Sequence, residues 1–516
     1  MSEASGLCSR SWQRLRRRSN SLAPSARSGL PPRQRSLRAT LAWSYELLPD
    51  GLRRFLRRLS IFRGAFCAQG AAAVTGEELA GELLVHLRGY SLVGRVTDDR
   101  GHGFVLLETV REFLAQQLEP DEAPGLAERH ARWYLSLVST PAPDPLETAW
   151  RQERAVANIR VALAWALAND TEAALVAATA LDPFWELRGN HVEGCGWLVA
   201  ALAAAPHAPA ALRGAAASVY GRLACYALPQ DRAQAVLEQA VADLRAADAP
   251  VVARFQALLF LCIVATARDD AAAVDAAHAE AAALAAADGS PVARFFLLNT
   301  VYHQALLRRD YDAALAALRA NSEVVASLGD PVLTLRHLAQ QAFVEVACGE
   351  LAAAEATLAA IPAEPLGSVR GVWTLQAAFA EVRLRYRQGR RAESVALLAA
   401  VADQIAGSVP VHAHHAAEFV SQVLSDRGRH NDALAWLEVG ARWRAQWGVV
   451  YDFALDADDR ARIRAAAEAA LSPAQAQAAT ASGLGWTTET LAEALRELPE
   501  VAAAATSAGP RVAMLG

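Results

Sequence analysis

The apolar pattern of the chain changes at residues 104–114, FVLLETVREFL. The first residues of this stretch form the continuous apolar run of a β-strand, whereas Leu107, Val110 and Leu114 recur at the three- and four-residue intervals of a helix. The segments before it predict a small mixed α/β unit, and the segments after it predict almost continuous helix. We therefore expect these residues to join two parts of the chain.

Residues 37–119 have the pattern of a winged helix. Helical spacing covers residues 37–48, 52–60, 68–74 and 77–90. Two apolar strands, at residues 92–97 and 103–106, flank a turn of Asp, Arg and Gly residues, which tolerate tight turns. A leading helix, three further helices, a two-stranded wing and a closing helix make up this unit.

The third helix of this unit is poorly suited to reading DNA. Base reading requires Arg, Asn or Gln side chains facing the bases and basic side chains for the phosphates. This helix instead carries Glu77, Glu78 and Glu82 against one arginine, and the wing tip holds two aspartates beside Arg100. Because acidic side chains repel phosphate, we expect the helix to serve packing or regulation.

From residue 168 onward the chain repeats at intervals close to 40 residues. Seven predicted turns lie 38 to 41 residues apart, at Gly189, Gln230, Arg268, Arg309, Gly349, Gly389 and Gly428. A small residue follows five positions after each turn, at Gly194, Ala235, Ala273, Ala314, Ala354, Ser394 and Ala433. A small residue lets a partner helix approach closely, and a leucine four positions later in most units fills the groove. Two helices per unit predict a tetratricopeptide-like α-solenoid.

The expected fold class is mainly α, a small winged helix followed by this α-solenoid. The expected parts are a basic flexible arm or remnant of an upstream domain at residues 1–36, the winged helix at 37–119, connecting helices at 120–167, the solenoid at 168–470 and an alanine-rich cap and tail at 471–516. A composition of 53% hydrophobic and 20% charged residues is typical of globular proteins. No apolar stretch of about 18 residues and no secretory leader are present, so we expect a cytoplasmic protein without a membrane partner.

Positive charge is concentrated at the start of the chain, although the whole chain has a net charge of −5. Residues 1–63 hold fourteen arginines against three acidic residues. The candidate nucleic-acid contacts are Arg14, Arg16, Arg17 and Arg18. No aromatic residues for base stacking alternate with them, so a flexible arm or a domain remnant is the favoured interpretation, and DNA stays an open partner.

Catalytic motifs are absent from the sequence. All 50 basic residues are arginine, so no lysine exists for a nucleotide-binding phosphate loop. We found no nucleophile elbow, zinc-protease pair or calcium loop. The best metal candidate, His414 with Glu418 at helical spacing, is equally well explained as a solvated helix start. We therefore expect no catalytic residue, metal or cofactor.

Several stretches resemble a known family. In chain order they are LRATLAWSYELLPDG, LRRLSIFRGAF, LLVHLRGYSLVGR, FVLLETVREFLAQQL, ERHARWYLSLV and NIRVALAWALAND. Together they resemble the segment that follows the nucleotide-binding domain in bacterial STAND-class regulators, which are signal-transduction ATPases of the NB-ARC type. The resemblance covers residues 37–197, and the repeats beyond match only as a class.

The resemblance implies that the winged helix packs on a nucleotide-binding domain and that the repeats sense an inducer or partner. The upstream domain is expected to be missing, so the ATPase would be a partner in trans. Animal and plant relatives have a nucleotide-touching histidine where this chain has Leu107. We therefore expect Leu107, Glu108 and Arg111 to form a coupling element without nucleotide, with Leu107 buried.

The leading hypothesis is a non-enzymatic regulatory scaffold whose helical repeats bind a protein partner or a small effector. The alternative is a DNA-binding transcriptional regulator that uses the winged helix with the basic arm. A third interpretation is the remnant of a longer gene without activity of its own.

Overall fold

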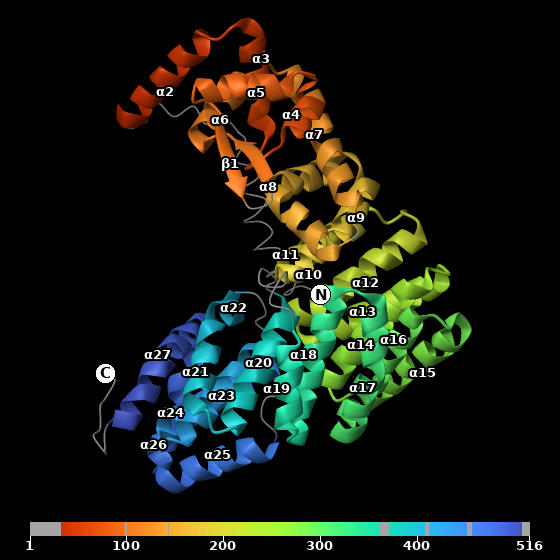
Figure 1. Ribbon diagram of the computed structural model, residues 1–516, viewed down its shortest axis with the longest axis vertical. Helices are drawn as coiled ribbons and strands as arrows, with labels where there is room; N and C mark the ends of the chain where they lie inside the picture. The colour runs from red at the N-terminus through yellow and green to blue at the C-terminus, as the bar shows by residue number, and fades with distance from the viewer. Residues whose placement is uncertain are drawn as a thin grey trace. The chain divides into compact units, whose positions relative to one another are not determined.

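The computed structural model describes residues 32–98, 101–142, 144–361, 371–407, 412–450 and 457–507. It confirms a mainly helical fold, with a winged helix followed by a solenoid-like body of helical repeats (Figure 1). The chain forms two compact units, residues 1–184 with 196–208 and residues 185–195 with 209–516. The finer domain boundaries stay predictions. None of the described helices is long and apolar enough to cross a membrane.

The winged helix has the predicted order of elements. These are α2 (Pro32–Glu46), α3 (Asp50–Arg58), α4 (Ala68–Thr75), α5 (Ala80–Gly89), β1 (Gly94–Asp98), β2 (Gly101–Val105) and α6 (Glu108–Ala115). The strands pair antiparallel with Gly94 opposite Val105, and a bridge between Phe66 and Phe104 extends the sheet. Phe55 is fully buried and anchors the core beneath them.

Connecting helices follow the winged helix: α7 (Glu122–Ser139), α8 (Pro145–Asn169), α9 (Thr171–Ala180), α10 (Asp182–Leu187) and α11 (His191–Ala204). The long helix α8 begins where the sequence favours a helix start. Asp144 accepts a hydrogen bond from the backbone N–H of Leu146, and Pro145 takes the first helical position, where its missing N–H costs nothing.

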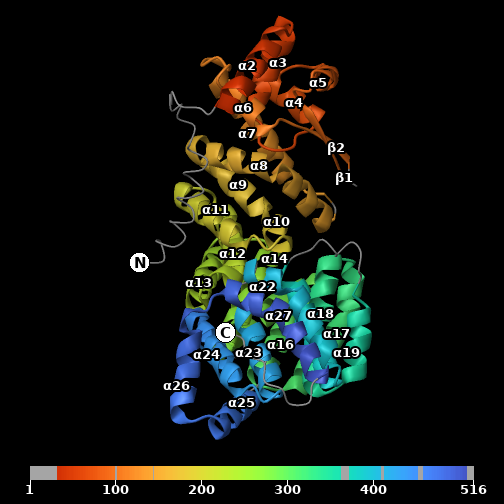
Figure 2. The same cartoon turned by 90° about the vertical axis from the view of Figure 1, so that its left-hand side faces the viewer.

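Antiparallel helix pairs build the repeat body (Figures 1 and 2). Its helices are α12 (Ala210–Ala227), α13 (Gln230–Ala246), α14 (Val251–Ala267), α15 (Ala271–Asp288), α16 (Pro291–Leu307), α17 (Tyr311–Leu328), α18 (Pro331–Cys348), α19 (Leu351–Ala359), α20 (Val372–Arg387), α21 (Arg391–Ala400), α22 (Ala402–Gly407), α23 (Ala413–Ser425) and α24 (His430–Trp447). In the unit formed by α16 and α17, Ala314 and Leu318 are buried as the repeat predicts. Leu306, at the end of α16, is fully buried against them.

Two of the predicted turn positions are wrong in register. The left-handed turn residue is Asp269 (φ +62°) rather than Arg268, and Gln230 is already the first residue of α13. The buried small positions of these two units are accordingly not Ala235 and Ala273 but Ala233 and Val274, both fully buried. The register follows the helix cap: Asp270 caps α15 through the backbone N–H of Ala273, as Asp310 caps α17 through that of Ala313.

Three helices close the described chain: α25 (Ala457–Ala470), α26 (Pro473–Ser482) and α27 (Thr488–Ser507). The predicted helix at residues 491–498 is the middle of α27, whereas α26 was not predicted. The rings of Trp436 and Trp486 pack at a tilt of 48° with their centroids 4.5 Å apart, and Arg442 donates hydrogen bonds to the carbonyls of Gly483 and Trp486. The tryptophan-rich helix α24 is therefore part of the packed core.

Candidate functional site

The predicted coupling element is only partly buried. Arg111 is 7% exposed and forms an ion pair with Glu108 one turn away. The expectation that Leu107 is buried is wrong, because its side chain is 66% exposed. Leu107 is the N-cap residue of α6 and has an extended backbone. It therefore precedes the helix and does not share the buried face to which Val110 belongs. The coupling role of these residues stays a prediction. The four candidate nucleic-acid arginines, Arg14 to Arg18, lie outside the described residues.

A buried asparagine that the sequence analysis missed joins the winged helix to the connecting helices. Asn158 on α8 is fully buried, and its Oδ1 accepts the backbone N–H of Arg63 at 2.6 Å. Its amide nitrogen donates to the carbonyl of Ala65 at 3.0 Å, and Nε2 of His130 on α7 lies 3.1 Å from Oδ1. Burial lowers the pKa of His130 to about 4, so the ring is neutral. We call Asn158, His130, Arg63 and Ala65 the Asn158 clasp.

The exposed residues of α5 are mixed rather than basic, because Glu82, His86 and Arg88 are exposed together with Val85. Leu79 and Tyr90, at the two ends of the helix, and Val85 are each more than half exposed. The nearby arginines of α3 are held by carboxylates, because Arg58 bonds Glu122 at 2.7 Å. This face is therefore better suited to a protein contact than to a phosphate backbone.

Inside the repeat body, side chains from five helices converge on one polar site. We call it the inner cluster, formed by Glu186 of α10, Arg222 and Tyr226 of α12, His303 of α16, Arg336 of α18 and Trp373 of α20. No catalytic motif marked these residues in the sequence. The available signal was spacing, since polar and aromatic residues recur every four positions on α16 (Phe295, Asn299, His303) and on α12.

Glu186 holds one side of the inner cluster together. It forms an ion pair with Arg222 and accepts a hydrogen bond from the indole N–H of Trp373 at 3.1 Å. Gly371 permits this approach, because a Cβ there would lie 2.9 Å from the carbonyl oxygen of Glu186. Partial burial raises the pKa of Glu186, and the Trp373 hydrogen bond and the charge of Arg336 oppose that rise.

Arg336 lies on the other side, among aromatic rings. Its guanidinium carbon is 4.8 Å from the ring centre of Trp373, 5.7 Å from Phe260 and 5.9 Å from Phe295. Its single hydrogen-bond acceptor in the described chain is Oδ1 of Asn299, at 3.5 Å, and no carboxylate of the described residues lies within ion-pairing distance. The side chain is nevertheless buried, with 5% exposure.

Other polar atoms of the inner cluster also lack partners among the described residues. They are the hydroxyl of Tyr226, both ring nitrogens of His303 and Nε of Arg336. Burial, with the nearby charge of Arg336, lowers the pKa of His303 to about 3, and burial raises that of Tyr226. Burial also lowers the pKa of Arg222 to about 10. At neutral pH the His303 ring and the Tyr226 hydroxyl are therefore neutral groups that can donate hydrogen bonds.

Five other sites among the described residues combine one glutamate with two arginines, but there the arginines are more exposed. These sets are Glu77 with Arg54 and Arg58, Glu122 with Arg57 and Arg58, Glu280 with Arg245 and Arg254, Glu355 with Arg385 and Arg390, and Glu418 with Arg444 and Arg460. Each of their arginine side chains is at least 15% exposed. We call the last set the outer clamp. In the outer clamp the carboxylate of Glu418, which the sequence offered as a metal ligand with His414, pairs with two arginines instead. The described residues contain no group of three or more His, Cys, Asp and Glu that could hold a metal.

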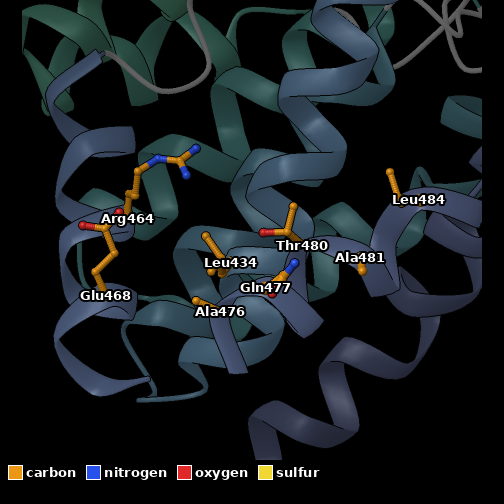
Figure 3. A pocket seen from close by; sticks show the side chains of 8 residues that line it. All are labelled: Leu434, Arg464, Glu468, Ala476, Gln477, Thr480, Ala481 and Leu484. Atoms are coloured by element: carbon orange, nitrogen blue, oxygen red, sulfur yellow. The ribbon is translucent and has the colours of Figure 1, made fainter. Parts of the chain in front are cut away.

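A shallow depression of about 380 Å³ lies between α24, α25 and α26 (Figure 3). Its lining residues are Leu434, Arg464, Glu468, Ala476, Gln477, Thr480, Ala481 and Leu484. Arg464 is paired with Glu438 at 2.6 Å, and the floor is the small core of Leu434, Ala467 and Ala479. These contacts explain the depression as part of the cap.

Comparison with known proteins places the winged helix in a family. Residues 45–126 match the family described as MalT winged helix domain. A Mycobacterium bovis protein provisionally named as an HTH-type transcriptional regulator is 35% identical over 182 residues, which cover 33% of this chain and 20% of that protein. An uncharacterized protein of the same organism is 32% identical over 124 residues, covering 22% of this chain and 30% of that protein.

The chain thus spans a fifth to three tenths of the length of these relatives. A solved structure of a STAND protein with a tetratricopeptide repeat sensor, from Pyrococcus horikoshii, aligns with a TM-score of 0.40 and 12% identity, over 92% of this chain and 68% of that one. Residues 45–126 therefore match a winged helix of the MalT type.

Proposed function

We propose that the chain is the sensing part of a transcriptional regulator, in which the repeat body binds a small effector and the winged helix passes on the response. The inner cluster carries this proposal. It gathers charged, hydrogen-bonding and aromatic groups at a water-poor point, as small-molecule sites do.

A small effector fits the inner cluster better than a protein partner does. Tyr226, His303 and Arg336 are each at most 6% exposed, so a folded partner cannot reach them. Polar groups buried without partners cost free energy that a ligand can offset. In this proposal the Asn158 clasp transmits strain from α7 and α8 to the winged helix. The side chain of Asn158, on α8, contacts His130 of α7 and bonds the backbone of Arg63 and Ala65 in the winged helix.

Thermal unfolding tests the effector proposal. We expect a protein-free extract of cells that naturally carry the gene to raise the melting temperature by a few degrees, about 2–4 °C per kcal/mol of binding free energy. Trp373→Leu should remove this response, whereas Trp486→Leu in the cap should lower the melting temperature but keep it. An extract that leaves the wild type unchanged at every concentration contradicts the proposal.

The exposed apolar residues of the winged helix support a contact with a second protein, in line with an ATPase partner in trans. Trp43, Leu47, Leu79, Val85 and Tyr90 are each more than half exposed. We expect Val85→Glu to abolish co-purification with such an ATPase chain and to leave the melting temperature unchanged. Equal recovery of the partner with the wild type and the variant would remove this contact from consideration.

DNA binding is the second candidate, and the name of the Mycobacterium bovis regulator favours it. It predicts retention of duplex DNA that falls steeply with salt and disappears when residues 1–36 are removed. A filter-binding assay that retains no duplex at low salt excludes it. Salt-sensitive retention that survives removal of the arm would move the contact to the winged helix itself.

A further inference from the structure

Arg336 is a buried arginine that forms no ion pair with a carboxylate of the described residues, although the charge of Glu186 acts on it from a greater distance. Its side chain is 5% exposed, and its one hydrogen bond, to Asn299, is long at 3.5 Å. Aromatic faces attract a guanidinium, but they do not replace a counter-ion in a water-poor site. A protein retains such a group at a cost in stability, so a role outside stability is expected for it.

Arginines that share a glutamate elsewhere in the described chain are more exposed to water than those of the inner cluster. In the other five sets of one glutamate and two arginines among the described residues, every arginine side chain is 15% or more exposed. There the second positive charge is balanced by water and ions. In the inner cluster, Arg222 at 8% exposure is already paired with Glu186, and Arg336 forms no ion pair with a carboxylate of the described residues.

The groups beside Arg336 are donors that suit an oxyanion. The Tyr226 hydroxyl, one N–H of the neutral His303 ring and Nε of Arg336 can each donate a hydrogen bond, and none has a partner among the described residues. The rings of Trp373 and Phe260 form apolar walls around the guanidinium. Charge-assisted hydrogen bonds are strong in such surroundings, where water competes little.

We propose, building on the effector site above, that the effector carries a carboxylate group and that Arg336, Tyr226 and His303 bind it. The cluster contains two arginines and one glutamate, so it has one more basic than acidic side chain. One extra basic group matches the single negative charge of a carboxylate better than a phosphate ester with nearly two. Binding requires the inner helices to separate, and a helical-repeat array permits this because each pair packs only on its neighbours. Carboxylate binding thereby changes the curvature of the repeat body.

The test separates a small-molecule extract of the native cells by charge on an anion-exchange resin and measures the melting temperature of the full chain with each fraction. We expect stabilisation from the retained, anionic fraction. Its activity should survive phosphatase treatment and disappear after carbodiimide coupling of carboxylates to an amine. Stabilisation by the unretained fraction alone, or loss after phosphatase, overturns the carboxylate and leaves the effector site standing. No stabilisation by either fraction overturns both.

Matched variants locate the carboxylate at the inner cluster. Arg336→Gln should weaken binding of the purified active compound roughly a hundredfold in calorimetry, because a buried charge partner is removed. Arg319→Gln, at the exposed ion pair with Glu350, should bind as the wild type does. Tyr226→Phe removes only a hydroxyl and should weaken binding about tenfold. If Arg336→Gln does not fold, this variant tests whether the inner cluster binds the carboxylate. Wild-type affinity in Arg336→Gln, or in Tyr226→Phe in that case, overturns the assignment.

Discussion

The inner cluster and the outer clamp contain the same charged groups in opposite arrangements. In the outer clamp the carboxylate of Glu418 is fully buried, and Arg444 and Arg460 are 17% and 19% exposed. In the inner cluster the arginines are buried, and the carboxylate of Glu186 is 18% exposed. A buried anion between solvated cations is electrostatically complete, so the clamp fastens α23, α24 and α25 together. Buried cations beside a single exposed anion are incomplete, which is why we assign binding to the inner cluster.

Removing the carboxylate charge should give the largest contrast between the two sites. We expect Glu186→Gln to lower the free energy of unfolding by about 3–5 kcal/mol, because it leaves Arg222 buried without a counter-ion. Glu418→Gln should cost only about 1 kcal/mol, because both of its arginines can turn to water. Urea titration of the two variants measures the difference. Equal losses would show that burial of the arginines does not distinguish the sites.

Acid should destabilise the chain partly through His303 of the inner cluster. Its folded pKa of about 3 lies below the unfolded value of 6.5, so below that value the unfolded state binds the proton and stability falls as the pH drops towards about 3. One such group contributes a slope of at most about 1.4 kcal/mol per pH unit.

Unfolding titrations between pH 7 and pH 4 check this prediction. His303→Gln should flatten this dependence of stability on pH. His337, whose pKa burial lowers to about 4, should contribute in the same direction. An unchanged slope in His303→Gln would show that this ring is protonated or solvated in the folded state.

A methyl group tests how tightly each site is packed. At Gly371 a Cβ would lie 2.9 Å from the carbonyl oxygen of Glu186, whereas at Gly440 it would lie 2.7 Å from Cγ of Glu418. A backbone carbonyl can shift less than a side chain to relieve a close contact. We therefore expect Gly371→Ala to lower the free energy of unfolding by about 2–3 kcal/mol and Gly440→Ala by about 1–2 kcal/mol. Thermal melting of both variants decides the order, and a larger loss at Gly440 would reverse our view of which site is rigid.

The smallest effect is expected at the joint between wing and helix. Leu107→Asp should change the free energy of unfolding by less than about 0.5 kcal/mol, because Leu107 is 66% exposed. Val110→Asp, three residues on, should cost several kcal/mol, because Val110 is 4% exposed and the new charge would be buried. Chemical denaturation of the pair checks this, and a large loss in Leu107→Asp would restore the buried position that the sequence predicted.

Features set by neighbouring residues could be predicted from the sequence. The pairing of β1 with β2, the positive-φ turns at Gly349 and Gly389 and the 40-residue unit depend on chain conformation within a few positions. The two register errors, at Gln230 and Arg268, lie in units without a glycine to mark the turn, although Arg309, which also replaces a glycine, was predicted in register. Their caps, not their turn residues, define the helix starts.

The binding site could not be predicted in the same way. Glu186, Arg222, Arg336 and Trp373 are separated by tens of residues, and each resembles an ordinary polar or aromatic residue of an amphipathic helix. Leu107 likewise fits a helical apolar pattern and yet faces solvent. Local sequence determined which segments become helices and where they turn. Only the packing of those helices decided which side chains lose water, and that desolvation makes Arg336 a candidate anchor and not a surface charge.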